Sequence, residues 1–184
     1  MNVKEVSECF ISAKKEDNKG RKHRGLLIIK PNKKLAEEYI AKAKQNLEFC
    51  EIYKDKRVDY KLPEEWFYTL YYCALAILNK FGVESRSQRC TAVFLRYIKD
   101  KSLIDYNDEF IERITVYREK EETSDVDRRE SARYGAHIKI PEIEQEYKKM
   151  METCRSAISQ CEEIVFSDNE CKIPEEVKSL DSRR

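Results

Sequence analysis

The residues best suited to chemistry in this sequence are an arginine, tyrosine and histidine cluster at 128–137, which reads RRESARYGAH. Arg129 and Arg133 are four residues apart and share one face of a helix, and His137 follows at the same spacing if the helix continues through Gly135. Guanidinium groups hold a phosphate and its developing charge, while an imidazole moves a proton near neutral pH. The cluster therefore indicates phosphodiester chemistry, and the alternative is a solvent-exposed face paired with neighbouring carboxylates.

Other catalytic patterns are missing from the sequence. It contains no Walker loop, dinucleotide fingerprint, nucleophile elbow or H-E-x-x-H motif. The two histidines, His23 and His137, are far apart and no cysteines form a C-x-x-C pair, which argues against a zinc site. No carboxylate is expected within an apolar stripe, where burial would raise its pKa for acid–base catalysis. We therefore expect no metal and no cofactor.

Helical periodicity of apolar residues from about 31 to 166 predicts the elements that position this cluster. The expected helices begin at capping residues or prolines: after Asn32, at Pro63, after Ser87, after Asn107 and at Pro141. The helix from Pro63 ends at Gly82 and is apolar on two faces, which predicts that it is the central, most buried helix. The helix after Asn107 is expected to reach Tyr134, with or without a break.

These patterns predict an all-α fold, an up-and-down bundle of four to five helices. A chain of 184 residues that is 41% hydrophobic and 39% charged has the composition of one globular domain. Only four glycines and four prolines argue against β-sandwiches, barrels and Gly-rich nucleotide loops. The segment Gly25-Leu-Leu-Ile-Ile-Lys30 could form a short strand, and a buried strap is the alternative.

Charge and composition divide the chain into three parts. Residues 1–30 are predicted to form a basic, solvated N-terminal arm, 31–166 the helical domain, and 167–184 a flexible C-terminal tail. Residues 1–34 hold ten basic and four acidic side chains, whereas 141–184 hold seven and eleven. The basic residues of the arm could instead contact phosphates.

The seven cysteines, at 9, 50, 73, 90, 154, 161 and 171, are an odd number and widely scattered. The sequence also shows no signal-peptide core and no apolar run of the roughly 18 residues that span a bilayer. We therefore expect reduced thiols, several of them small core residues, in a cytoplasmic protein without membrane contact.

Four blocks of sequence resemble a family of known proteins. They read GLLIIKPNKKLAEEYIAKAKQNL at 25–47, EWFYTLYYCALAILNKFG at 65–82, SRSQRCT at 85–91 and RESARY at 129–134. In this order, over about 110 residues, they resemble a small prokaryotic HEPN-domain protein of the stand-alone subfamily common in archaea. The resemblance implies a helical bundle, a homodimer, and frequent operation beside a minimal nucleotidyltransferase in toxin–antitoxin pairs.

Many HEPN domains are metal-independent RNases that use an Arg, four to six residues and then a His, with two copies facing one RNA. The resemblance matches Arg129 to the family arginine and Tyr134 to the tyrosine that closes the block, whereas the histidine has no clean match. Together with the chemistry of the cluster, this predicts Arg129, Arg133 and His137 as catalytic residues and Arg86, Arg89, Arg129 and Tyr134 as RNA- or nucleotide-binding residues. Seven residues separate Arg129 from His137, and three separate Arg133 from it. Gln88 stands where this subfamily often has a histidine.

Two hypotheses about function follow. The first is a HEPN toxin-like protein of a toxin–antitoxin or defence system that binds RNA and cleaves it without a metal. The second is a non-catalytic helical partner that docks a minimal nucleotidyltransferase. The homodimer is expected to form through the helices of 107–134, because the motif would be incomplete in one copy.

Overall fold

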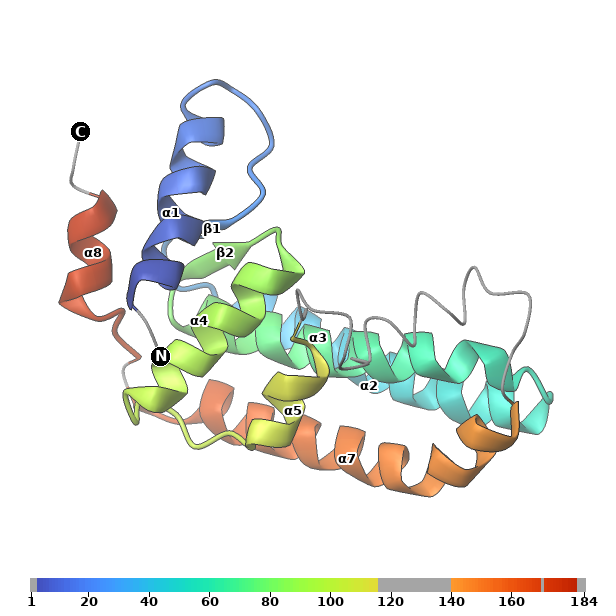
Figure 1. Cartoon of the computed structure of the whole chain (residues 1–184). Helices are drawn as coiled ribbons and strands as arrows, with labels where there is room; N and C mark the ends of the chain where they lie inside the picture. Colours follow the sequence, from blue (N-terminus) through green and yellow to red (C-terminus); the bar gives the residue numbers. More distant parts are fainter. Residues whose placement is uncertain (1–2, 116–139, 170, 182–184) are drawn as a thin grey trace.

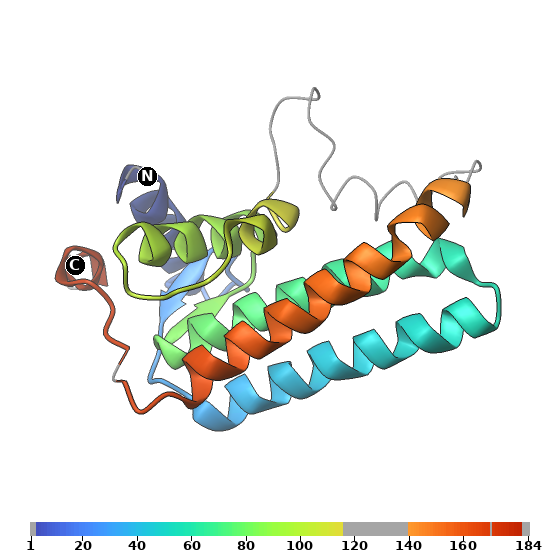
Figure 2. The same cartoon turned by 90° about the horizontal axis from the view of Figure 1, so that it is seen from below.

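Three long helices lie side by side and form the main body of the molecule (Figures 1 and 2). They are α2 (Lys33–Asp55), α3 (Leu62–Lys80) and α7 (Ile140–Phe166), with a short 3-10 turn, η1 (Asp59–Lys61), between α2 and α3. The computed structural model describes residues 3–115, 140–169 and 171–181. The all-α prediction is confirmed.

The three helices begin where the capping chemistry predicts. The side chain of Asn32 accepts a hydrogen bond of 3.0 Å from the backbone N–H of Leu35 and so caps α2. Pro63 lies in the first turn of α3, and Gly82 follows that helix with a φ of 72°, a conformation that favours glycine. The sequence prediction for these boundaries is confirmed.

Helix α3 is the central element, as its two apolar faces predict. Phe67 and Ile77 are fully buried, and the indole of Trp66 is 4% exposed. Because α2 covers one side of this helix and α7 another, both apolar faces are removed from water. Tyr71, on the same helix, is only half-buried.

A second region lies at one end of the long helices (Figure 1). It contains α1 (Val3–Asp17), β1 (Leu26–Ile28), β2 (Val83–Ser85), α4 (Gln88–Asp100) and α8 (Glu175–Asp181). Strands β1 and β2 pair antiparallel, with Leu27 opposite Glu84. Of the two alternatives for the segment 25–30, the structure therefore has the strand.

The expectation of a solvated N-terminal arm is wrong for residues 3–17, which form helix α1. Its Val6, Cys9, Phe10 and Ala13 recur at helical spacing and are buried. Gly25 allows the chain after α1 to pass close to that helix, because a Cβ at this position would lie 2.3 Å from the carbonyl oxygen of Cys9. The charged residues between these four positions weaken the apolar periodicity of the segment, so the sequence alone did not predict this helix.

The expectation of a flexible tail is also wrong for the described part of 167–184. Ile173 is 6% exposed and Val177 is fully buried, and α8 lies against α1. The hydroxyl of Tyr97 donates a hydrogen bond of 2.5 Å to Glu176. Two apolar residues in a short polar segment give too weak a periodicity to predict a helix.

The helix predicted after Asn107 begins there but ends early. Asn107 caps α5 (Asp108–Arg113) by accepting from the N–H of Glu109, and Ile114 closes the helix. The predicted continuation to Tyr134 falls on 116–139, outside the described residues. The division of the chain at 30 and 166 stays a prediction. Among the helices that the structure describes, none is long and apolar enough to span a membrane.

Candidate functional site

The sequence-predicted site residues fall into two groups. Arg129, Arg133, Tyr134 and His137 belong to 116–139, outside the described residues, so their assignment stays a prediction. Arg86 and Arg89 lie at the start of α4, within the described residues. We call residues 85–91 the α4 turn.

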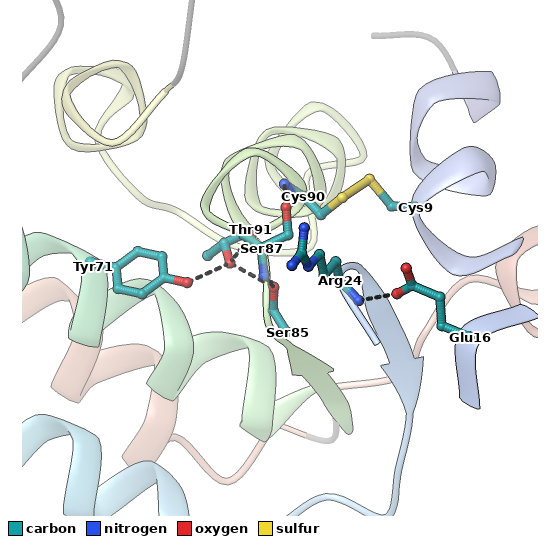
Figure 3. The surroundings of a disulfide bond; sticks show 8 residues. All are labelled: Cys9, Glu16, Arg24, Tyr71, Ser85, Ser87, Cys90 and Thr91. Atoms are coloured by element: carbon teal, nitrogen blue, oxygen red, sulfur yellow. Dashed lines mark hydrogen bonds between the residues drawn. A yellow bond between two sulfur atoms is a disulfide. The ribbon is translucent and has the colours of Figure 1, made fainter. Parts of the chain in front are cut away.

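A network of hydroxyl groups holds the α4 turn in place (Figure 3). Ser87 caps α4, accepting a hydrogen bond of 3.3 Å from the N–H of Cys90. The Thr91 hydroxyl lies 2.9 Å from the carbonyl oxygen of Ser87, 2.8 Å from the Ser85 hydroxyl and 3.5 Å from the hydroxyl of Tyr71. The start of α4 is therefore a preorganised surface of backbone and hydroxyl dipoles.

Three arginines lie in or beside the α4 turn. Arg86 is exposed, Arg89 is half-buried, and the Arg24 side chain extends toward the turn in Figure 3 while its backbone N–H donates to Glu16. Arg86 pairs with Glu84 at 2.6 Å. The positive end of the α4 dipole adds to these charges, so an oxyanion such as a phosphate would be stabilised here.

The carboxylate of Glu84 offsets part of this positive charge. Its carboxylate accepts from Arg86 and lies 3.3 Å from Nε2 of His23, which is 4% exposed. Because β1 pairs with β2, His23 lies beside Glu84, which is 61 residues away in the sequence and directly precedes the α4 turn. Sequence spacing gave no indication of this pairing.

Aromatic rings form a second feature beside the turn, which we call the tyrosine row: Tyr39 of α2 with Tyr68 and Tyr72 of α3. The Tyr39 and Tyr72 ring centroids are 6.0 Å apart with planes at 20°, and the Tyr68 and Tyr72 centroids are 5.9 Å apart at 27°. All three rings are half-buried. The ammonium of Lys42 lies 5.5 Å from the Tyr39 centroid and 5.7 Å from that of Tyr72.

The tyrosine row and the α4 turn are close enough to interact. Burial raises the pKa of Tyr39, Glu84 raises it further, and Arg86 lowers it, so the charges of Arg86 in the turn and of Glu84 directly before it both act on this phenol. Tyr39 recurs at helical spacing with the apolar residues of α2, such as Leu35 and Ala43, so its position in the sequence does not distinguish it from a core residue. The repeated tyrosines at 68, 71 and 72 were the available signal for a half-buried aromatic surface.

A disulfide bond joins Cys9 of α1 to Cys90 of the α4 turn (Figure 3). The expectation that all thiols are reduced is therefore wrong for this pair. The two residues are 81 positions apart in a pattern without paired spacing, so only the fold brings them together. The remaining cysteines carry free thiols, and four of them are buried: Cys50, Cys73, Cys154 and Cys161.

One carboxylate also departs from the sequence prediction. Burial, and then the neighbouring charge of Glu64, raise the pKa of Glu65 to about 6, although Lys61 lowers it. Burial together with Glu65 and Glu51 raises the pKa of the Cys50 thiol to about 12. Cys50 is therefore protonated near neutral pH and is not suited to nucleophilic attack.

Within 3–115, 140–169 and 171–181, no three His, Cys, Asp or Glu side chains are arranged to hold a metal ion. In comparisons with known proteins, no family model, no curated protein and no solved structure matches this chain. The function of the site is therefore inferred from the chemistry of its own residues.

Proposed function

We propose that this chain is an RNA-binding protein of the HEPN type and that the α4 turn holds the phosphate backbone of the RNA. The observation that carries the proposal is that Arg86 and Arg89 flank the first residue of α4, Gln88, and that the Arg24 side chain extends toward the same helix start. Arg86 and Arg89 belong to a block, SRSQRCT, on which the resemblance rests. Guanidinium groups bind phosphates with two parallel hydrogen bonds, and a helix N-terminus adds amide donors.

The balance of charge suggests how such binding would work. The formal charge of the whole chain is only +1, so attraction to RNA has to come from a local cluster and not from the overall field. Arg86 already has Glu84 as a partner and would exchange part of that pairing for a phosphate. Binding of this kind depends on counterion release and weakens steeply with salt.

A direct test compares two arginine variants in RNA binding. The probe is a fluorescein-labelled single-stranded RNA of mixed sequence, followed by anisotropy at 50 and 200 mM salt. We expect Arg86→Ala with Arg89→Ala to weaken binding by about tenfold or more and to reduce the salt slope by about 2. Arg155→Ala is the matched control, because Arg155 is an exposed arginine of α7 paired with Glu51 at 3.1 Å. No binding by the wild type, or equal binding by all variants, would contradict the proposal.

The cleavage step proposed for this RNA uses the cluster of 128–137. Arg129 would hold the scissile phosphate, Arg133 would support its charge, His137 would act as the base, and Tyr134 would position the strand. His137 would take the proton of the 2′-hydroxyl as its oxygen attacks the adjacent phosphorus; the P–O5′ bond would break, leaving a 2′,3′-cyclic phosphate on one product and a 5′-hydroxyl, protonated from water, on the other, with no metal needed. In an RNA degradation assay with EDTA present, we expect loss of cleavage by orders of magnitude in Arg129→Ala and about 100-fold in His137→Ala. Binding without cleavage by the wild type would reject the catalytic step alone.

The same proposal includes a homodimer, since two copies of the motif would face one RNA. Light scattering over a wide concentration range tests this, and a monomer throughout would contradict it. If the wild type binds no RNA but co-purifies with a minimal nucleotidyltransferase, the non-catalytic partner hypothesis replaces the present one.

A further inference from the structure

The tyrosine row is a group of half-buried aromatic residues that lie against one another on the long helices. Phe67 next to it is fully buried, whereas Tyr39, Tyr68 and Tyr72 are each half-buried. The three rings come from two helices and lie at 20° to 27° to one another, so their planes are nearly aligned. Such an arrangement presents rigid π-faces at little conformational cost.

A chain of ring contacts connects this row to the α4 turn. The hydroxyl of Tyr71 lies 3.5 Å from that of Thr91, and the Tyr71 ring is stacked on Phe67 at 5.7 Å. Phe67 contacts Tyr68 at 5.4 Å, and from there the row continues to Tyr72 and Tyr39. Because Phe67 is fully buried, these contacts join the row to the turn through the core, and at the surface the charge of the exposed Arg86 acts on the half-buried Tyr39.

The charges along the row suit the same ligand. Lys42 lies over Tyr39 and Tyr72 at 5.5 and 5.7 Å and is itself exposed. Its ammonium can leave the ring faces and pair with a phosphate, which frees those faces for bases. Aromatic faces beside cations are the combination that binds single-stranded nucleic acids with little sequence preference.

We propose that the tyrosine row stacks the bases of single-stranded RNA whose phosphates bind at the α4 turn. This inference rests on the proposed function and narrows its ligand from RNA in general to unpaired strands. A duplex holds its bases inside the helix and offers the row only phosphates and sugars. The turn would bind either form, and the row would distinguish between them.

The experiment measures the affinity of the full chain for two probes, labelled oligo(U) of 12 nucleotides and a 12-base-pair RNA duplex. We expect Tyr39→Leu with Tyr72→Leu to weaken oligo(U) binding by about 10- to 100-fold and to leave duplex binding unchanged. The matching Tyr→Phe double variant should stay within about threefold of the wild type, because it keeps the rings. Tyr60→Leu is the control, since Tyr60 also has a lysine over its ring, Lys61 at 5.7 Å, but stands outside the row.

The outcomes separate this inference from the proposed function. If the wild type binds neither probe, both fail. If Arg86→Ala with Arg89→Ala weakens both probes but the Leu variant binds oligo(U) normally, only the tyrosine inference is overturned. Light scattering and thermal unfolding of each variant complete the test. A Leu variant that folds but changes from dimer to monomer would show that a second copy covers the row, which also overturns the inference.

Discussion

The long helices α2, α3 and α7 and the end region around α4 share one hydrophobic core and differ in what is added to it. In the bundle, fully buried side chains such as Phe67, Ile77 and Cys161 fill the space between helices. The end region also buries apolar side chains, such as Val6 and Phe94, and adds a disulfide and a two-stranded sheet that join segments distant in sequence. The comparison indicates that hydrophobic burial builds both regions, while specific pairings fix the surface on which we place the site.

The ion pairs of the end region add little to its stability. Lys101 pairs with Glu176 at 2.8 Å and Arg96 with Asp108 at 2.6 Å, and Lys99 also contacts Asp108. These groups are partly exposed, and surface pairs contribute about 0–1 kcal/mol each. Attachment of α1 and α8 therefore depends mainly on their few buried residues and on the disulfide.

The largest expected effect concerns the bundle. Phe67→Ala removes a fully buried ring from α3, and we expect it to lower the free energy of unfolding by about 3–5 kcal/mol. Urea denaturation followed by circular dichroism measures this change. Trp66, the one tryptophan of the chain, is 4% exposed and reports on the same core by fluorescence. A loss below about 1 kcal/mol would contradict the central position of α3.

The same reasoning applied to Tyr71 gives a smaller loss than a fully buried ring would. Tyr71 is half-buried, so its replacement by alanine should cost less than that of Phe67. Equal losses for the two variants would show that the exposed part of Tyr71 is covered in solution.

The second prediction concerns the end region. Loss of the Cys9–Cys90 disulfide, in Cys9→Ser with Cys90→Ser, should lower the free energy of unfolding by about 2–4 kcal/mol, because it releases a closure of 81 residues. Hydrogen exchange should become faster in α1 and remain slow in α3. Cys171→Ser, at a half-buried free thiol, is the control and should change neither. Peptide mapping of the unreduced protein that finds free thiols at 9 and 90 would contradict the bond.

These two regions also differ in how far the sequence predicted them. The helix starts at Asn32, Ser87 and Asn107 were predicted because a cap and an apolar period are local signals. The Cys9–Cys90 bond, by contrast, depends on contacts between distant segments, which leave no periodic signal in one sequence. The buried stripe of α1 consists of only four residues, and the charged residues between them weaken its apolar periodicity.

The candidate site follows the same division. Arg86 and Arg89 were selected from a sequence block, and the structure places Arg24, a basic residue of the N-terminal segment, beside the same turn through the pairing of β1 with β2. The tyrosine row was missed because Tyr39 fits the apolar periodicity of α2, whereas Tyr72 fits no apolar stripe of α3. Periodicity gives the face of a helix but not how completely that face is covered.

The third prediction compares two caps of the same kind, one in each region. Asn32→Ala should cost about 1 kcal/mol, the usual loss for one capping hydrogen bond. Ser87→Ala should cost no more than this, about 0.5–1 kcal/mol, because its capping bond is longer, 3.3 Å, and the hydroxyl network contacts only the Ser87 backbone, which alanine keeps. Thermal unfolding gives both values. A clearly larger loss for Ser87 would mean that the network depends on the Ser87 hydroxyl.

The smallest expected effect concerns Glu65, a half-buried carboxylate in the first turn of α3. Its pKa is raised to about 6 in the folded protein, above its ordinary value, so the folded state favours the protonated carboxyl. Its stability contribution is therefore most favourable below about pH 4.5 and is lost as pH rises through about 6. Glu65→Gln should be more stable than the wild type at pH 7 by roughly 0.5–1 kcal/mol, after allowance for solvent screening of a half-buried group.

The difference between Glu65→Gln and the wild type should disappear below about pH 4.5, where both side chains are neutral. Glu64→Gln is the matched control with a different signature. It removes the partner that Lys61 contacts at 3.5 Å, and it should also lower the pKa of Glu65, because the charge of Glu64 is one of the causes that raise it. A carboxyl titration by NMR measures both shifts directly. An ordinary pKa for Glu65 in the wild type, or equal stability of Glu65→Gln and the wild type at pH 7, would show that water reaches this carboxylate in the bundle as freely as it reaches the arginines of the α4 turn.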